Sequence, residues 1–70
     1  MIDYGFSYTG HVKNGERNGI GRINCNNGYS YFGEWKDNKR NGYGIETFPD
    51  GKRCKSLFAE GEFIESVDFN

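Results

Sequence analysis

The chain has 70 residues, of which 34% are apolar and 17% aromatic, and its net charge at neutral pH is −1. This length allows one small domain, and so small a charge gives no reason to expect a nucleic-acid partner. The 11 glycines without proline enrichment exclude collagen, and the aromatic content argues against disorder.

The opening "MIDYGFSYTG" lacks both the basic start and the apolar core of a signal peptide. No apolar run approaches the ~20 residues of a membrane span. We therefore expect an intracellular, cytoplasmic protein, with peripheral attachment to a membrane as the alternative. A chain of this length is either a complete small protein or part of a longer array, and the sequence leaves both open.

Taken in chain order, the predicted elements are strands separated by tight turns. Apolar residues and glycines recur at every second position in residues 6–12 and 29–35, which is the period of a strand with one packed face. Turn residues follow at 14–15, 27–28, 38–42 and 49–51. The pattern predicts an all-β fold, an elongated, single-layer antiparallel β-meander of five or six strands.

A repeat underlies this pattern. Shifting the chain by 23 residues aligns residues 5–27 with 28–50 and gives nine identities: Gly5/Gly28, Ser7/Ser30, Tyr8/Tyr31, Gly10/Gly33, Lys13/Lys36, Arg17/Arg40, Asn18/Asn41, Gly19/Gly42 and Gly21/Gly44. A period of this length is typical of a stacked array rather than of a catalytic domain.

The repeat resembles the MORN (membrane occupation and recognition nexus) family, whose pattern is Tyr-x-Gly-x-Trp-x-x-Gly-x-x-x-Gly-x-Gly. The first unit departs from it at Val12 and the second at Asn38, where the family has tryptophan and glycine. The best match is the second unit, with Tyr31, Gly33, Trp35, Gly42, Gly44 and Gly51; the first has Tyr8, Gly10, Gly15, Gly19, Gly21 and Gly28.

The resemblance covers about residues 5–65. We interpret residues 1–70 as one domain with repeats at about 8–30 and 31–53 and a degenerate cap at 54–65. The resemblance implies stacked β-hairpins that act as scaffolds or dimerisation modules, with phospholipid binding also proposed for the family. It implies no enzymatic activity, because the catalytic domain of multidomain members has no counterpart here.

A register follows from the turn at Asn27–Gly28. Pairing across this turn predicts one row of small residues, Gly10, Gly21, Gly33, Gly44 and Ser56, and a neighbouring row, Val12, Gly19, Trp35, Gly42 and Phe58. In the first hairpin, a turn at Asn14-Gly15 is also compatible with a register shifted by two residues. A glycine opposite an aromatic ring leaves a trough in which the ring lies over the backbone. We therefore assign structural roles to Tyr8, Gly10, Gly19, Gly21, Tyr31, Gly33, Trp35, Gly42 and Gly44.

The sequence predicts no catalytic, cofactor or metal site. His11 is the single histidine, and we expect it on the face opposite Tyr8. Cys25 and Cys54 fall about 14 Å apart, three strand spacings, so we expect both to remain thiols. The stretch 37–42 faintly resembles a calcium loop, but Lys39 occupies a ligand position.

Two candidate binding surfaces remain, and the apolar one lies on the face of the predicted sheet away from Tyr31 and Trp35. The apolar one, a candidate for partner binding, consists of Ile20, Phe32, Tyr43, Ile45 and Leu57. The basic one, a candidate for anionic headgroups, consists of Lys36, Lys39, Arg40, Lys52, Arg53 and Lys55. The apolar surface either stays open or is closed by the tail, where Phe63, Val67 and Phe69 alternate.

The function we expect is that of a non-enzymatic protein–protein interaction module: a scaffold, an adaptor or a small inhibitor that docks on a larger partner through a sheet face or edge. A second copy of the chain is an alternative partner. A phospholipid-binding module that uses the basic residues of 36–40 and 52–55 is the alternative function.

Overall fold

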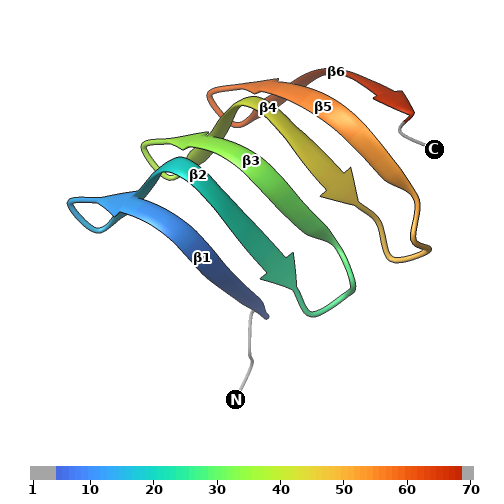
Figure 1. Ribbon diagram of the computed structural model, residues 1–70, viewed down its shortest axis with the longest axis horizontal. Coiled ribbons are helices and arrows are strands. Elements are labelled where there is room, and N and C mark those ends of the chain that lie inside the picture. The colour runs from blue at the N-terminus through green and yellow to red at the C-terminus, as the bar shows by residue number, and fades with distance from the viewer. Residues whose placement is uncertain (1–4, 69–70) are drawn as a thin grey trace.

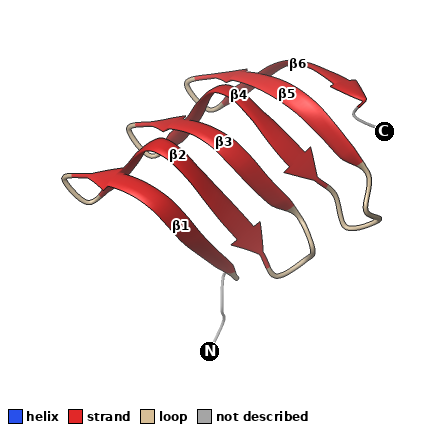
Figure 2. Ribbon diagram, viewed as in Figure 1, coloured by secondary structure: helices blue, strands red, loops and turns tan. Residues whose placement is uncertain are grey.

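The computed structural model describes residues 5–68 and contains one antiparallel sheet of six strands in the order β1-β2-β3-β4-β5-β6 (Figures 1 and 2). The predicted fold class is therefore confirmed. The strands are β1 (Phe6–Lys13), β2 (Glu16–Cys25), β3 (Ser30–Lys36), β4 (Lys39–Thr47), β5 (Arg53–Ala59) and β6 (Glu62–Asp68). The sheet is curved along its strands rather than flat, as Figure 1 shows.

The three short turns at one end of the sheet share a left-handed backbone. Asn14–Gly15 and Asp37–Asn38 both have positive φ angles, as do Glu60 and Gly61. This is the conformation of the two-residue turns that match the twist of a hairpin. The predicted turn at 38–42 is therefore too long, because Lys39 already begins β4.

The predicted row of small residues is confirmed. Gly10 pairs with Gly21, Gly33 pairs with Gly44, and Gly44 pairs with Ser56. Because Gly21 also pairs with Gly33, the row crosses five strands without interruption. It provides the smooth strip of backbone on which rings from the neighbouring rows lie.

The predicted row of large residues is only partly right. Gly19 pairs with Trp35 and Gly42 with Phe58, as expected. Trp35, however, pairs with Arg40 across the β3–β4 hairpin, and Val12 likewise pairs with Arg17. Each hairpin contains a β-bulge, which moves the register by two residues.

The bulges have the same construction in both repeats. Gly19 and Gly42 lie in them with φ angles of +92° and +106°, which favour glycine. The N–H of Ile20 donates to Nδ1 of His11 at 3.3 Å, and the N–H of Tyr43 donates to Oε2 of Glu34 at 3.2 Å. Side chains thus satisfy amides that the bulges take out of the ladder.

The tail extends the sheet instead of closing a face. β6 pairs with β5, and Phe63 and Val67 are 57% and 63% exposed. Phe63 lies opposite Phe58 and Val67 lies opposite Lys55, so the two side chains do not share a face. Closure by the tail is therefore wrong for these residues, while Phe69 lies outside the described residues.

Candidate interaction surfaces

One face of the sheet, here called the inner face, carries the tyrosines and tryptophan of the repeats. The phenol of Tyr8 lies on Gly21, where a Cβ atom would be 2.5 Å or less from two ring atoms and the hydroxyl oxygen. Tyr31 lies on Gly44 in the same way, with two ring atoms and the hydroxyl oxygen 2.4–2.5 Å from the position of a Cβ. Glycine at these positions is a requirement of ring packing, as the sequence predicted.

The rings of the inner face form a continuous ladder across the strands. Each ring meets the next nearly at a right angle, with centroids 5.4–5.9 Å apart, the favourable edge-to-face geometry. The order is Tyr8, Trp35, Tyr31, Phe58 and Phe63. Tyr31, Trp35 and Phe58 are buried and form the core of the domain.

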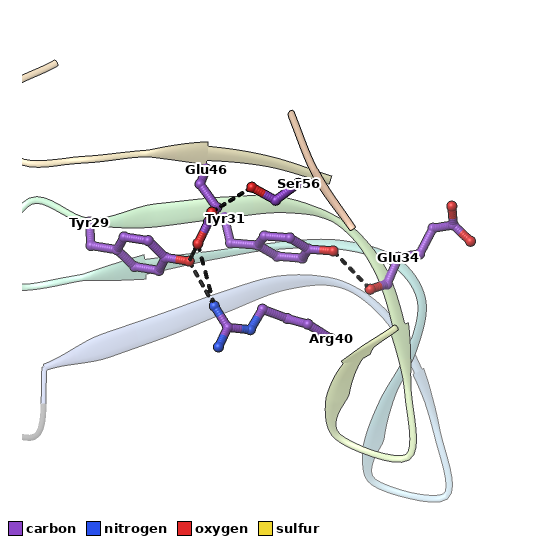
Figure 3. A network of polar contacts seen from close by, with 6 residues as sticks. All are labelled: Tyr29, Tyr31, Glu34, Arg40, Glu46 and Ser56. Atoms are coloured by element: carbon purple, nitrogen blue, oxygen red, sulfur yellow. Dashed lines mark hydrogen bonds and ion pairs between the residues drawn. The ribbon is translucent and has the colours of Figure 1, made fainter. Parts of the chain in front are cut away.

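A polar network borders this ladder (Figure 3). Glu46, 8% exposed, accepts hydrogen bonds from the hydroxyls of Tyr29 at 2.6 Å and Ser56 at 2.5 Å. Arg40 donates to the Tyr29 hydroxyl at 2.7 Å and lies 3.9 Å from the Glu46 carboxylate. A carboxylate with this many partners is stable in a buried position.

The same surroundings hold two phenols in their neutral form. Burial raises the pKa of Tyr31 to about 12. Burial, followed by the hydrogen bond to Glu46, raises the pKa of Tyr29 above its ordinary value. The hydroxyl of Tyr31 donates to the backbone carbonyl of Glu34 at 3.1 Å. In this neutral form both phenols donate hydrogen bonds.

Two arginines lie over the rings, a feature that sequence reasoning missed. The guanidinium carbon of Arg17 is 4.7 Å from the centroid of Trp35, and that of Arg40 is 4.2 Å from that of Phe58. These are cation–π distances. The identity of Arg17 and Arg40 in the repeat was the available signal, but it did not indicate that the side chains turn onto the rings.

Hydrogen bonds also connect two of the hairpin turns to neighbouring strands, through Arg17, Asn18, Arg40 and Asn41. The N–H of Asn38 donates to the Arg17 carbonyl at 3.0 Å, and that of Gly61 to the Arg40 carbonyl at 2.8 Å. Asn18 and Asn41 accept from the amides of the same two turns, at 3.2 and 2.9 Å. The β3–β4 turn therefore docks on the beginning of β2, and the β5–β6 turn docks on the beginning of β4.

The opposite face, here called the outer face, brings together the five apolar residues predicted for partner binding. Ile20, Phe32 and Tyr43 are 44%, 44% and 50% exposed, whereas Ile45 and Leu57 are half-buried. Phe32 pairs with Ile45, and Tyr43 pairs with Leu57. A shallow hollow of about 230 Å³ lies among Ile20, Phe32, Tyr43 and Ile45.

The six predicted basic residues do not form one patch. Lys36 pairs with Lys39 beside the β3–β4 turn, while Arg53 pairs with Thr47 at the opposite end of β4, with Lys52 next to it. From Lys39 to Thr47, β4 spans about 25 Å. Figure 1 shows that its two ends lie at opposite ends of the sheet. Arg40 lies on the inner face in the network around Glu46. Lys55 is on the outer face, opposite Ile45.

Among residues 5–68, no three His, Cys, Asp or Glu side chains form a group that could hold a metal ion. Cys25 and Cys54 are both thiols, as expected. His11 has the structural role of accepting a bulge amide. The described part of the chain also contains no helix long and apolar enough to cross a membrane.

The fold and its two faces define a class: a repeat protein built as a single-layer β-sheet, in which a regular inner face supports a variable outer one. The sequence matches the MORN repeat at residues 8–28 and 31–53, which is more than half of the chain. The chain therefore belongs to the MORN repeat family. That family is a non-enzymatic repeat module known in protein and membrane interaction. Comparison with curated proteins gave no match.

Proposed function

We propose that this protein is a non-enzymatic interaction module that docks on a larger protein through its outer face. The observation that carries the proposal is the exposed apolar cluster of Ile20, Phe32, Tyr43, Ile45 and Leu57. The described residues form one six-stranded sheet, and no second layer of theirs covers this face. An apolar sheet face without a second layer is typical of an interaction surface.

The charges around this cluster favour a partner with acidic residues at the rim of its own apolar surface. Arg22 lies 5.3 Å from the centroid of Phe32, and Nζ of Lys55 lies 5.1 Å from that of Tyr43. Each cation therefore lies over one of the two rings, at a cation–π distance. Aromatic anchors with basic neighbours are common where binding energy is concentrated.

Docking of this kind serves a scaffold, an adaptor or an inhibitor equally well, because each requires a rigid face rather than a reaction. A second copy of the chain is an alternative occupant of the same face. Anionic lipid is the alternative ligand, through Lys36 and Lys39 at one end of the sheet. The cytoplasm is the compartment we propose, with peripheral attachment to a membrane as the alternative.

The test is affinity purification from the native cell, followed by measurement of the dissociation constant with the purified partner. Replacing Phe32 and Tyr43 with threonine keeps the β-propensity of both strands but removes the rings. If the two rings together contribute about 2 kcal/mol to the binding free energy, the double variant binds about thirtyfold more weakly. Thr47→Ser on the same face is the matched control and retains the partner.

Two other outcomes would reject the proposed surface. Unchanged binding by the double variant moves the interface elsewhere. Sedimentation with anionic vesicles at low salt, lost on charge reversal of Lys36 and Lys39, favours the lipid alternative. Analytical ultracentrifugation of both proteins separates self-association from partner binding, because the dimer would dissociate in the double variant.

A further inference from the structure

A cleft of about 350 Å³ lies on the inner face, within the size range of small-molecule sites. Residues from β2, β3 and β4 line it, together with the loop before β3 and the β3–β4 and β5–β6 turns. The lining combines an apolar part with three cations: Ile23, Tyr29 and Trp35, and Arg17, Lys39 and Arg40. None of the partner-binding residues of the outer face belongs to it.

The cations of the cleft differ in how they are neutralised. Arg40 has the carboxylate of Glu46 3.9 Å away. The side chain of Arg17 donates to Oδ1 of Asn38 at 3.2 Å and to its backbone carbonyl at 2.9 Å, and both acceptors are uncharged. Lys39 is exposed and faces a second hollow that Asp37 and Glu60 also line. Arg17 is therefore the principal source of positive potential in the cleft.

Arg17 is also held in a fixed orientation. Its guanidinium lies on Trp35 at 4.7 Å and within 6 Å of the centroids of Phe6 and Tyr8. A guanidinium group has five N–H donors, and the two bonds to Asn38 occupy two of them. The remaining donors belong to a group that loses little entropy when it binds a planar anion.

We propose that this cleft binds a carboxylate attached to a flat aromatic group. The carboxylate pairs with Arg17 and is attracted by Lys39, while the aromatic group lies against Ile23, Tyr29 and Trp35. Charge-assisted bonds to a guanidinium select the carboxylate, and the apolar lining selects the ring. The proposal is independent of the outer face. The same chemistry occurs in a free aromatic acid and at the end of a peptide chain that terminates in phenylalanine.

Nuclear magnetic resonance of the ¹⁵N-labelled protein provides a local test. Trp35 is the single tryptophan, and its indole N–H donates to the Gly21 carbonyl at 3.0 Å, so its signal is unique. We expect 2-naphthoate to shift the Trp35 indole and Arg17 Nε–H signals in a saturable way. The neutral analogue 2-naphthamide should bind about tenfold more weakly. An acetylated tripeptide ending in phenylalanine, titrated alongside, shows by its relative affinity which source the cleft prefers.

A matched pair of lysines makes the test independent of folding. Lys39 lines the cleft, whereas Lys36 pairs with it across the hairpin and lines only the neighbouring hollow. We expect Lys39→Gln to weaken 2-naphthoate binding about threefold and Lys36→Gln to leave it unchanged. Arg17→Met should abolish the preference for 2-naphthoate over 2-naphthamide, and Arg17→Lys should restore part of that preference.

Three results would overturn the proposal. The first is equal affinity for the acid and the amide, because charge would then play no part. The second is an equal effect of Lys36→Gln and Lys39→Gln. The third is the absence of a saturable shift at Trp35, or a shift confined to residues around Phe32 on the outer face.

Discussion

On the inner face Tyr31 and Phe58 are 0% and 4% exposed, whereas on the outer face Phe32 and Tyr43 are 44% and 50% exposed. The residues are chemically alike, and a single layer of strands separates them. The difference lies in their neighbours, because the inner rings lie on glycine backbone and against one another. Burial in this domain therefore comes from troughs within one sheet and not from a second layer.

The two faces of the sheet have different roles. The spacing of the repeat determines the inner face, since Tyr8, Tyr31, Gly21 and Gly44 recur at 23-residue intervals. The outer face has no such constraint: Ile20 corresponds to Tyr43, and Thr9 corresponds to Phe32. A repeat protein can change its partner through the outer face without losing its fold.

The largest effect is expected for Gly33→Ala. An added Cβ would be 2.4 Å from the Gly44 Cα and 2.6 Å from the Tyr43 carbonyl oxygen, and both are backbone atoms. Because paired strands cannot move apart locally, we expect a loss of about 4 kcal/mol or more, most of the stability of a domain this small. Circular dichroism during urea titration measures the loss.

Gly51→Ala is the control for this substitution. Its Cβ would have no atom within 4 Å, and only the φ angle of +93° opposes it. Strain of this kind costs about 1–2 kcal/mol. Equal losses for the two variants would show that conformational freedom, and not the close approach of the strands, explains the glycine row.

Sequence reasoning was most accurate where a pattern repeats and least accurate where a single side chain determines the local structure. The pairing of Gly21 with Gly33 followed from turn chemistry and strand period, two local rules. The bulges at His11 and Glu34 did not, because they depend on side chains that satisfy amides nine residues away. Nor could strand period indicate the burial of Glu46, whose partners come from different elements.

Prediction of the candidate surfaces from the sequence was limited in the same way. Period two correctly placed Phe32 and Ile45 on one face, since face assignment needs only the register. It could not separate Lys39 from Arg53, which fall on neighbouring strands but at opposite ends. The cleft beside Arg17 was also not predicted, because cation–π stacking depends on the path of a long side chain.

Removing the buried carboxylate should also have a large effect. Glu46→Ala leaves the hydroxyls of Tyr29 and Ser56 without their acceptor and the guanidinium of Arg40 without its carboxylate partner. We expect a loss of about 3 kcal/mol in the free energy of unfolding, measured by urea titration. Glu34→Ala, which removes an exposed acceptor of one amide, should cost about 1 kcal/mol. Equal costs would contradict the importance of the inner network.

The two inner phenols predict a loss of stability at high pH. The pKa of Tyr31 is raised from 10.0 to about 12, and that of Tyr29 is raised too, so the native state retains protons that the unfolded chain releases. The stabilisation is complete below pH 10 and is lost as the pH rises from 10 toward 12. The slope approaches about 1.4 kcal/mol per pH unit for each phenol. Urea titrations between pH 8 and 11 measure it, and an unchanged slope in Tyr31→Phe would refute this origin.

The smallest effect is expected for Phe32→Thr, which makes on the outer face the change that Phe58→Thr makes on the inner one. Phe58 lies under Arg40 at 4.2 Å and against Tyr31 at 5.5 Å, so its loss should cost about 3–4 kcal/mol. Phe32 has Arg22 at 5.3 Å and solvent over nearly half its surface, and we expect a loss of at most about 1 kcal/mol. Thermal unfolding of the two variants gives the comparison directly. A cost for Phe32→Thr as large as that for Phe58→Thr would make the outer ring part of the core, and weaker partner binding by outer-face variants would then report unfolding instead of a lost contact.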